Sequence, residues 1–135
     1  KEFNKKVFDK INETFETNIN IDEVYKEKPK NIRIARKIFF NFDEYFSWPS
    51  LENEIVSKTG FCYGLDSHFG ILVNGDVIPC CLDQNACVKL GNTNSTQISD
   101  ILNSKRVKDI QKGFKNNILV EELCQKCEYR TRFDK

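Results

Sequence analysis

The sequence predicts a small α+β protein, and three observations lead to that prediction. The chain has 135 residues, of which 39% are hydrophobic, enough to bury one modest core. Two runs rich in β-branched residues flank an Asn-Gly pair at residues 74–75, a strong signal for a β-hairpin. Residues 96–114 carry apolar side chains at helical spacing. We therefore expect a small β-hairpin packed with helices, in one compact domain that can carry an appendage.

The N-terminal third is predicted to contain a helix and a strand. Apolar residues recur at steps of three and four over residues 3–15, which is typical of one face of a helix. Residues 18–30 are polar and contain Pro29, which indicates a connection. Residues 32–42 alternate in part between aliphatic and basic side chains, so they are predicted to form a strand whose Phe cluster faces a core.

The elements that follow are predicted from turn and capping residues. Pro49 disfavours a helical conformation at Trp48, so a loop is expected there. A short helix is predicted over residues 51–57, with Ser50 as its N-cap. The hairpin is predicted to turn at Asn74-Gly75 in type I′ geometry, which needs a positive φ at both residues.

The second strand of the hairpin is expected to end at Pro79. In the helical stretch over residues 96–114, Asn103-Ser104 interrupts the apolar pattern. Two short helices are therefore predicted, with Ser104 as the N-cap of the second and Gly113 near its end.

Charge and hydropathy argue against several classes of partner. The chain has 21 Lys and Arg residues against 20 Asp and Glu residues, so no strong field would attract nucleic acid or an anionic membrane. It has no apolar run of membrane-spanning length and no signal-peptide core, so a cytoplasmic location is expected. It has no Met and opens within a helical pattern, which leads us to expect a piece of a longer protein.

The six cysteines admit a disulfide framework, a metal site or scattered buried thiols. Chains rich in disulfides are usually secreted and poor in core residues, unlike this one, so disulfides are disfavoured. A C-x-x-C pair lets two thiolates converge, and two further cysteines near the hairpin complete a set that suits zinc or an iron–sulfur cluster. The predicted ligands are Cys62, Cys80, Cys124 and Cys127.

Neighbouring residues are expected to have other roles. His68, the only histidine, is expected to be solvated rather than a ligand, and Cys87 to be a small buried hydrophobe. Cys81 is expected to point away from Cys80, because neighbours on an extended chain face opposite ways, but it is the first candidate to replace a wrongly assigned ligand. A thioredoxin-like redox pair in the C-x-x-C segment lacks its usual strand-to-helix context.

The order of these motifs resembles a known family. Cys62, Gly75-x4-Cys80, Gly91-Asn92, a helical stretch and Cys124-x2-Cys127 follow one another as in the SPASM/twitch auxiliary-cluster domains of radical S-adenosylmethionine enzymes. The resemblance covers about residues 60–130. It implies that the four cysteines named above bind one auxiliary [4Fe–4S] cluster, as in the shorter, single-cluster twitch form.

The resemblance also implies a division of labour. Residues 1–48 would be the last helix and strand of a radical S-adenosylmethionine barrel, and residues 49–135 the cluster domain. The C-x3-C-x2-C motif of the radical-generating cluster is absent from this chain, so S-adenosylmethionine would bind only to the missing barrel. The implied partners are that barrel and a peptide or small-molecule substrate of the parent enzyme.

The implied function is electron transfer or closure of the substrate site, without catalysis by this chain alone. Asp83 is an equal candidate for a group around the cluster and for a turn cap. Tyr45, Trp48 and Tyr63 are candidates for a substrate channel, although packing is the more common role of such residues. The alternative function is a structural zinc-binding interaction module that uses the same four cysteines, because zinc and clusters share thiolate ligands and an isolated domain prepared in air can take up zinc.

Overall fold

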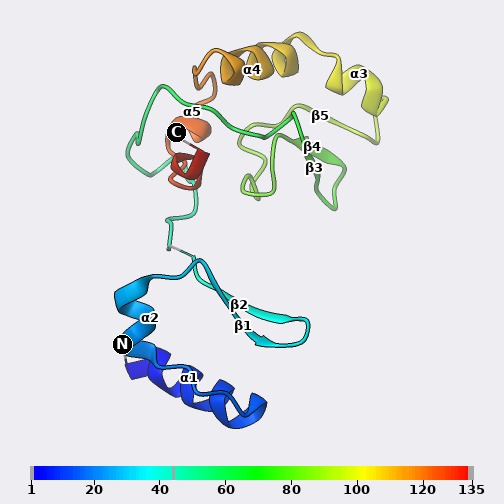
Figure 1. Cartoon of the computed structure of the whole chain (residues 1–135). Helices are drawn as coiled ribbons and strands as arrows, with labels where there is room; N and C mark the ends of the chain where they lie inside the picture. The colour runs from blue at the N-terminus through cyan, green and yellow to red at the C-terminus, as the bar shows by residue number, and fades with distance from the viewer. Residues whose placement is uncertain (1, 44, 134–135) are drawn as a thin grey trace. The chain divides into compact units, whose positions relative to one another are not determined.

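The structure is a computed structural model that describes residues 2–43 and 45–133. The chain divides into two compact units, residues 1–45 and residues 46–135, rather than folding around one core. Both helices and antiparallel strands are present, which confirms the predicted α+β class. Figure 1 shows the elements of each unit.

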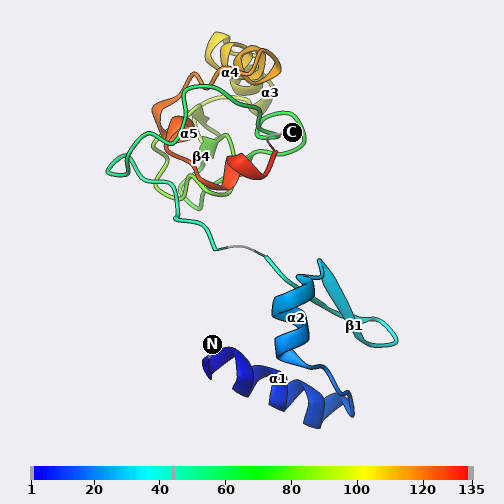
Figure 2. The same ribbon diagram turned by 60° about the vertical axis from the view of Figure 1, so that its left-hand side comes forward.

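The N-terminal unit begins with two helices, which Figure 2 shows in blue. The predicted first helix is confirmed as α1, Glu2–Phe15. The connection predicted over residues 18–30 contains a second helix, α2, Ile21–Glu27, so that prediction is wrong in this respect. This polar segment forms a helix because it has an N-cap. The side chain of Asn20 accepts a hydrogen bond from the amide of Asp22 at 2.9 Å.

The strand predicted over residues 32–42 is a hairpin of two strands, β1, Asn31–Ala35, and β2, Ile38–Asn41, so the prediction of a single strand is wrong. The turn lacks Gly and Asn, which is why the sequence did not reveal it. The Arg33 side chain holds the turn by donating hydrogen bonds to the carbonyls of Ala35 and Arg36, at 3.3 and 2.8 Å. The ring of Phe40 packs 5.3 Å from that of Phe8 on α1.

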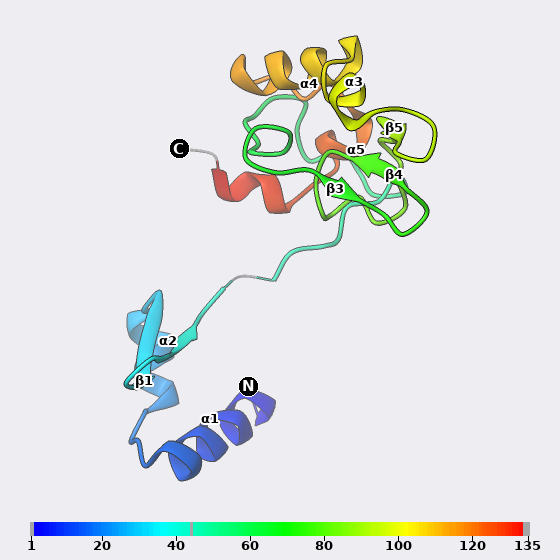
Figure 3. The same cartoon turned by 90° about the vertical axis from the view of Figure 1, so that its right-hand side faces the viewer.

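The C-terminal unit contains a three-stranded antiparallel sheet of order β3-β4-β5. Its strands are β3, Gly70–Ile71, β4, Asp76–Ile78, and β5, Gly91–Asn92, and Figure 3 shows β3 and β4 as opposed arrows. The predicted hairpin is confirmed, and β4 ends before Pro79 as expected. The third strand, β5, was not predicted, because two residues carry no periodic signal.

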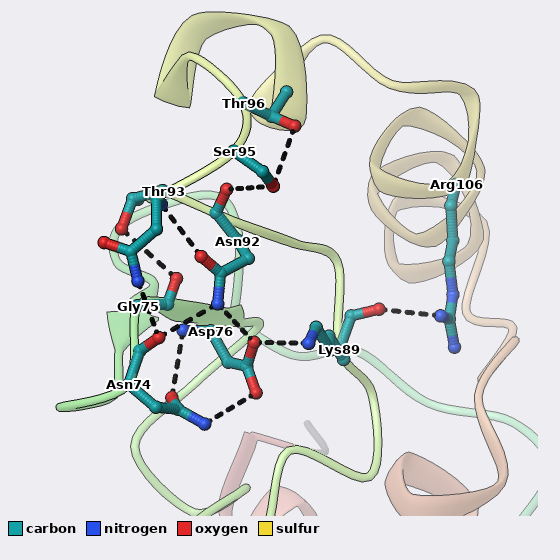
Figure 4. Close-up of polar contacts among 10 residues, drawn as sticks. Asn74, Gly75, Asp76, Lys89, Asn92, Thr93, Ser95, Thr96 and Arg106 are labelled. Atoms are coloured by element: carbon teal, nitrogen blue, oxygen red, sulfur yellow. Dashed lines mark hydrogen bonds and ion pairs between the residues drawn. The ribbon is translucent and has the colours of Figure 1, made fainter.

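The hairpin turn differs from the predicted type. Gly75 has a φ of 85°, but Asn74 is not among the described residues with positive φ, so the type I′ prediction is wrong. The Asn74 side chain instead bonds locally: its Oδ1 accepts from the amide of Asp76 at 3.1 Å and its Nδ2 donates to the carboxylate of Asp76 at 2.9 Å. Asn92 adds a third contact by donating to the same carboxylate at 2.8 Å (Figure 4). These bonds tie β5 to the hairpin.

Two predicted helices follow the sheet. They are α3, Ile98–Leu102, and α4, Lys105–Lys115, and Ser104 caps the second by accepting a hydrogen bond from the amide of Val107 at 3.4 Å, as predicted. The chain then forms α5, Glu122–Gln125, and a 3₁₀-helix, η1, Tyr129–Phe133.

The helix predicted over residues 51–57 is absent from the described structure. Only one turn forms, in which the amide of Asn53 donates to the carbonyl of Ser50 at 3.2 Å. The amides of Val56 and Ser57 then bond the carbonyl of Gln125, at 2.9 and 3.1 Å, which draws the chain out of a helical path. Among the described helices, none is both long and apolar enough to cross a bilayer.

The core of the C-terminal unit lies against one side of α4. Seven buried apolar side chains form it, and the thiols of Cys62 and Cys124 pack against its edge. Its members are Leu65, Val88, Val107, Ile110, Phe114, Leu119 and Leu123. The core therefore joins two of the segments that carry predicted ligands.

Candidate metal centre

The four predicted ligands line one cavity of about 480 Å³ in the C-terminal unit. They come from three segments that are far apart in the sequence, and each thiol is partly buried and free of disulfide bonds. The structure therefore brings together the set Cys62, Cys80, Cys124 and Cys127.

Cys62 is placed by backbone pairing between two loops. The amide of Leu119 donates to the carbonyl of Lys58 at 3.0 Å, and the amide of Gly60 donates to the carbonyl of Asn117 at 2.9 Å. The segment is held again further on, where the side-chain amide of Gln111 on α4 donates to the carbonyl of Leu65 at 2.7 Å. Cys62 lies between these anchors, so its thiol has a fixed position beside the core.

Cys80 follows β4 and approaches Cys62 across a glycine. A Cβ atom on Gly64 would lie 3.7 Å from the sulfur of Cys62, 3.7 Å from the Cβ of Cys80 and 3.1 Å from the carbonyl oxygen of Pro79. Of these three contacts, only the one with the Pro79 oxygen would be tighter than ordinary van der Waals contact. Gly64 therefore lies between Cys62 and Cys80, and both are within contact distance of its Cβ position.

The last two predicted ligands stand on α5 and directly after it. The Arg106 side chain, on α4, forms a two-pronged ion pair with Glu121, the residue before α5, with both N···O distances 2.8 Å. Arg106 also donates to the carbonyl of Lys89 at 2.9 Å, a contact drawn in Figure 4. One guanidinium thus fixes the Cys124 segment relative to the loop that follows Cys80.

Backbone amides surround three of the sulfurs. The amide of Gly64 donates to the sulfur of Cys62 at 3.4 Å, and the amide of Leu82 donates to that of Cys80. The amides of Arg130 and Tyr129 likewise donate hydrogen bonds to the sulfur of Cys127. Amide donors of this kind stabilise thiolates and tune the potential of an iron–sulfur centre.

Burial makes the free thiolates costly. Loss of hydration raises the pKa of Cys80 to about 11, and repulsion from Cys62 and Cys127 adds to that rise. Burial likewise raises the pKa of Cys124, and the charges of the other three cysteines contribute. These thiols are protonated at neutral pH unless a cationic centre binds them, so loading of such a centre releases protons.

Four cysteine thiolates form a ligand set for two kinds of centre. In a zinc site with four cysteine ligands the Zn–S bonds are about 2.3 Å, which brings neighbouring sulfurs to about 3.8 Å of one another. In an iron–sulfur cluster each thiolate binds a different iron. The four thiols share one cavity, so this donor set suits either centre.

The remaining candidate residues have various positions. Cys81 is exposed, but it lines the same cavity as Cys80, so the expectation that it points away from the site is not confirmed. Cys87 is exposed, so its prediction as a buried hydrophobe is wrong. The turn that contains it explains this, because the Asp83 carboxylate accepts hydrogen bonds from the amides of Cys87 and Val88 at 2.7 and 2.8 Å and the chain turns Val88, not Cys87, inward. His68 is exposed and bonds the hydroxyl of Ser67 at 2.9 Å.

Asp83 therefore acts as a turn cap, one of its two predicted roles. It is only 1% exposed, and it also lines the cavity. Of the aromatic residues considered for a channel, Trp48 and Tyr63 line the cavity, whereas Tyr45 is 95% exposed.

Sequence reasoning missed several lining residues. Phe46, Tyr129, Arg130 and Phe133 also border the cavity, and the rings of Phe46 and Tyr129 meet edge to face at 4.9 Å. The cluster of charged and aromatic residues directly after the C-x-x-C pair was the signal that could have found three of them. A helix after a ligand pair points its side chains back toward that pair.

Comparison with known proteins supports the assignment of this cavity. Residues 62–128 match the family model SPASM, described as an iron-sulfur cluster-binding domain. The matched segment begins at Cys62 and includes the other three predicted ligands. No curated protein and no solved structure gives a significant match.

Proposed function

Because residues 62–128 form a SPASM/twitch domain, a type of domain that binds iron–sulfur clusters, we propose that this chain holds a single [4Fe–4S] cluster. One thiolate would bind each iron, and the ligands would be Cys62, Cys80, Cys124 and Cys127. The observation that carries the proposal is that all four thiols line one cavity and lie within the segment that matches an iron–sulfur cluster-binding domain. The family match therefore supports a cluster over a zinc ion.

Four protein thiolates leave no iron open for a substrate, so the cluster would supply electron transfer without binding the reacting molecule. The chain's own residues then have three tasks. The cysteines would hold the centre, the amides of Gly64 and Leu82 would stabilise sulfur charge, and the rings of Trp48 and Tyr63 would form part of the cavity wall. Each task affects how readily the centre accepts an electron.

We further propose that the chain serves a radical S-adenosylmethionine parent enzyme, either in electron transfer or in closing the substrate site. The motif order described above supports this. The parent's barrel would be the immediate partner, and its substrate a peptide or a small molecule. Reading the coding sequence upstream of Lys1 tests the proposal: a C-x3-C-x2-C motif is expected, and a continuous reading frame without one would contradict it.

Anaerobic reconstitution tests the cluster itself. Purified chain treated with iron, sulfide and reductant is expected to show a broad visible absorption from thiolate-to-iron charge transfer, with about four iron and about four sulfide per chain. A colourless protein that binds one zinc and no sulfide would refute the cluster and support the zinc module.

A further inference from the structure

Arg130 is a buried cation at the wall of the thiol cavity. It stands on η1, three residues after Cys127, and is only 3% exposed. It lines the same cavity as the four thiols. A guanidinium stays charged in a protein, so its burial is unfavourable unless negative charge lies nearby.

The position of the guanidinium depends on a glycine beside Cys62. Gly60 has a φ of 144°, and a Cβ atom there would overlap Nη1 of Arg130 and lie 2.6 Å from its Cζ. Arg130 therefore lies directly on the backbone two residues before Cys62, while its own amide donates to the sulfur of Cys127. One residue thus contacts the segments of two predicted ligands.

The position of the guanidinium determines its electrostatic effect. It lies on the backbone two residues before Cys62 and lines the cavity that the four thiols share. A fixed cation at the wall of this cavity would stabilise a negative charge added to a centre inside it.

Three other charged side chains near the cavity have identified contacts of their own. The ammonium of Lys126, inside the C-x-x-C segment, pairs with Glu122 at 2.8 Å. The Asp83 carboxylate accepts hydrogen bonds from the backbone amides of Cys87 and Val88. Arg132, on the same short helix, lies over the rings of Phe46 and Tyr129, with 5.1 and 4.7 Å from its Cζ to the ring centroids.

We propose that Arg130 is a positioning residue whose buried guanidinium stabilises the reduced form of the cluster and so raises its midpoint potential. The inference rests on the proposed function. A one-electron reductant such as dithionite would supply the electron, which stays on the cluster; no bond forms or breaks, and Arg130 keeps its protons. Reduction adds one negative charge to a centre already anionic from four thiolates, and a nearby fixed cation favours that step.

The test is an anaerobic spectroelectrochemical titration of the reconstituted full chain. We expect Arg130→Gln to lower the equilibrium constant for reduction at least tenfold, a midpoint shift of about 59 mV for a one-electron couple. Arg130→Lys, which keeps the charge, should recover at least half of that shift. Arg132→Gln is the matched control, because it removes the same charge from the same helix but not from the cavity wall, and it should shift the potential much less.

Each outcome separates this inference from the proposed function. Wild-type protein that takes up no iron and sulfide would refute the proposed function before any variant is compared. Normal loading with equal potentials in wild type and Arg130→Gln, or equal shifts in Arg130→Gln and Arg132→Gln, would overturn the role of Arg130 alone. If Arg130→Gln takes up no cluster, Arg130→Lys is the variant that tests the proposal. Cluster uptake by Arg130→Lys with a near wild-type midpoint potential would support the role of the positive charge. Failure of Arg130→Lys to take up a cluster would show that Arg130 has a structural role only and would overturn the proposal.

Discussion

Val107 offers a quantitative test of the core that joins the cysteine segments. It is fully buried on α4, in contact with the apolar cluster beside Cys62 and Cys124. Val107→Ala removes two carbons, a transfer loss of about 1.6 kcal/mol at about 0.8 kcal/mol per carbon. A residual cavity of about 40 Å³ adds about 1 kcal/mol, and the better helix propensity of Ala returns about 0.5 kcal/mol. The expected loss in the free energy of unfolding is therefore about 2 kcal/mol.

Urea unfolding followed by Trp48 fluorescence measures this loss. Trp48 is the only tryptophan and belongs to the C-terminal unit, so its signal reports on that unit. With an m-value of about 2 kcal/mol/M, the midpoint should fall by about 1 M. Val73→Ala makes the same chemical change at a fully exposed position and should shift the unfolding free energy by less than about 0.5 kcal/mol. Equal midpoints for the two variants would refute the assignment of the core.

Three further predictions concern polar contacts. Asp83→Ala leaves the amides of Cys87 and Val88 without their acceptor, and should cost about 2–4 kcal/mol in urea unfolding; a cost below about 0.5 kcal/mol would contradict the capping role. A double-mutant cycle of Arg106→Gln and Glu121→Gln should give a coupling energy of about 1 kcal/mol that falls with added salt, and zero coupling would show the pair to be unimportant. Hydrogen bonds from Lys89 and Asn92 lower the pKa of Asp76, so its contribution is complete above the ordinary pKa of about 3.9 and is lost as pH falls through the lowered value. The difference in unfolding free energy between wild type and Asp76→Asn should therefore shrink below about pH 4, and a difference that grows there would contradict the assignment.

Strong local signals predicted much of the C-terminal unit. The Asn-Gly pair marked the hairpin, and Ser104 marked the start of α4, because turns and caps depend on a few neighbouring residues. The predicted turn type was wrong because Asn74 bonds Asp76 through its side chain and does not adopt a positive φ. Strand β5 was missed because it exists only through pairing with β4.

The candidate site was predicted less completely than the hairpin. The order of the motifs identified the four cysteines. No local sequence pattern shows that Gly64 lies between Cys62 and Cys80, or that the guanidinium of Arg130 lies against Gly60. The contact between Arg130 and Gly60 joins segments about 70 residues apart, and sequence periodicity describes only neighbours on one element. Cys87 shows the same limit, since its exposure depends on how Asp83 closes the turn.

The most direct test of the account is the iron and sulfide content of single Cys→Ser variants after anaerobic reconstitution. Serine at position 62, 80, 124 or 127 is expected to lower the content well below the wild-type value of about four each, because each change removes one iron's thiolate. Cys87→Ser is the matched control and should load as the wild type does, and Cys81→Ser tests the neighbour that also lines the cavity. Full loading of any of the first four variants, or a loss in Cys81→Ser as large as theirs, would contradict the proposed ligand set.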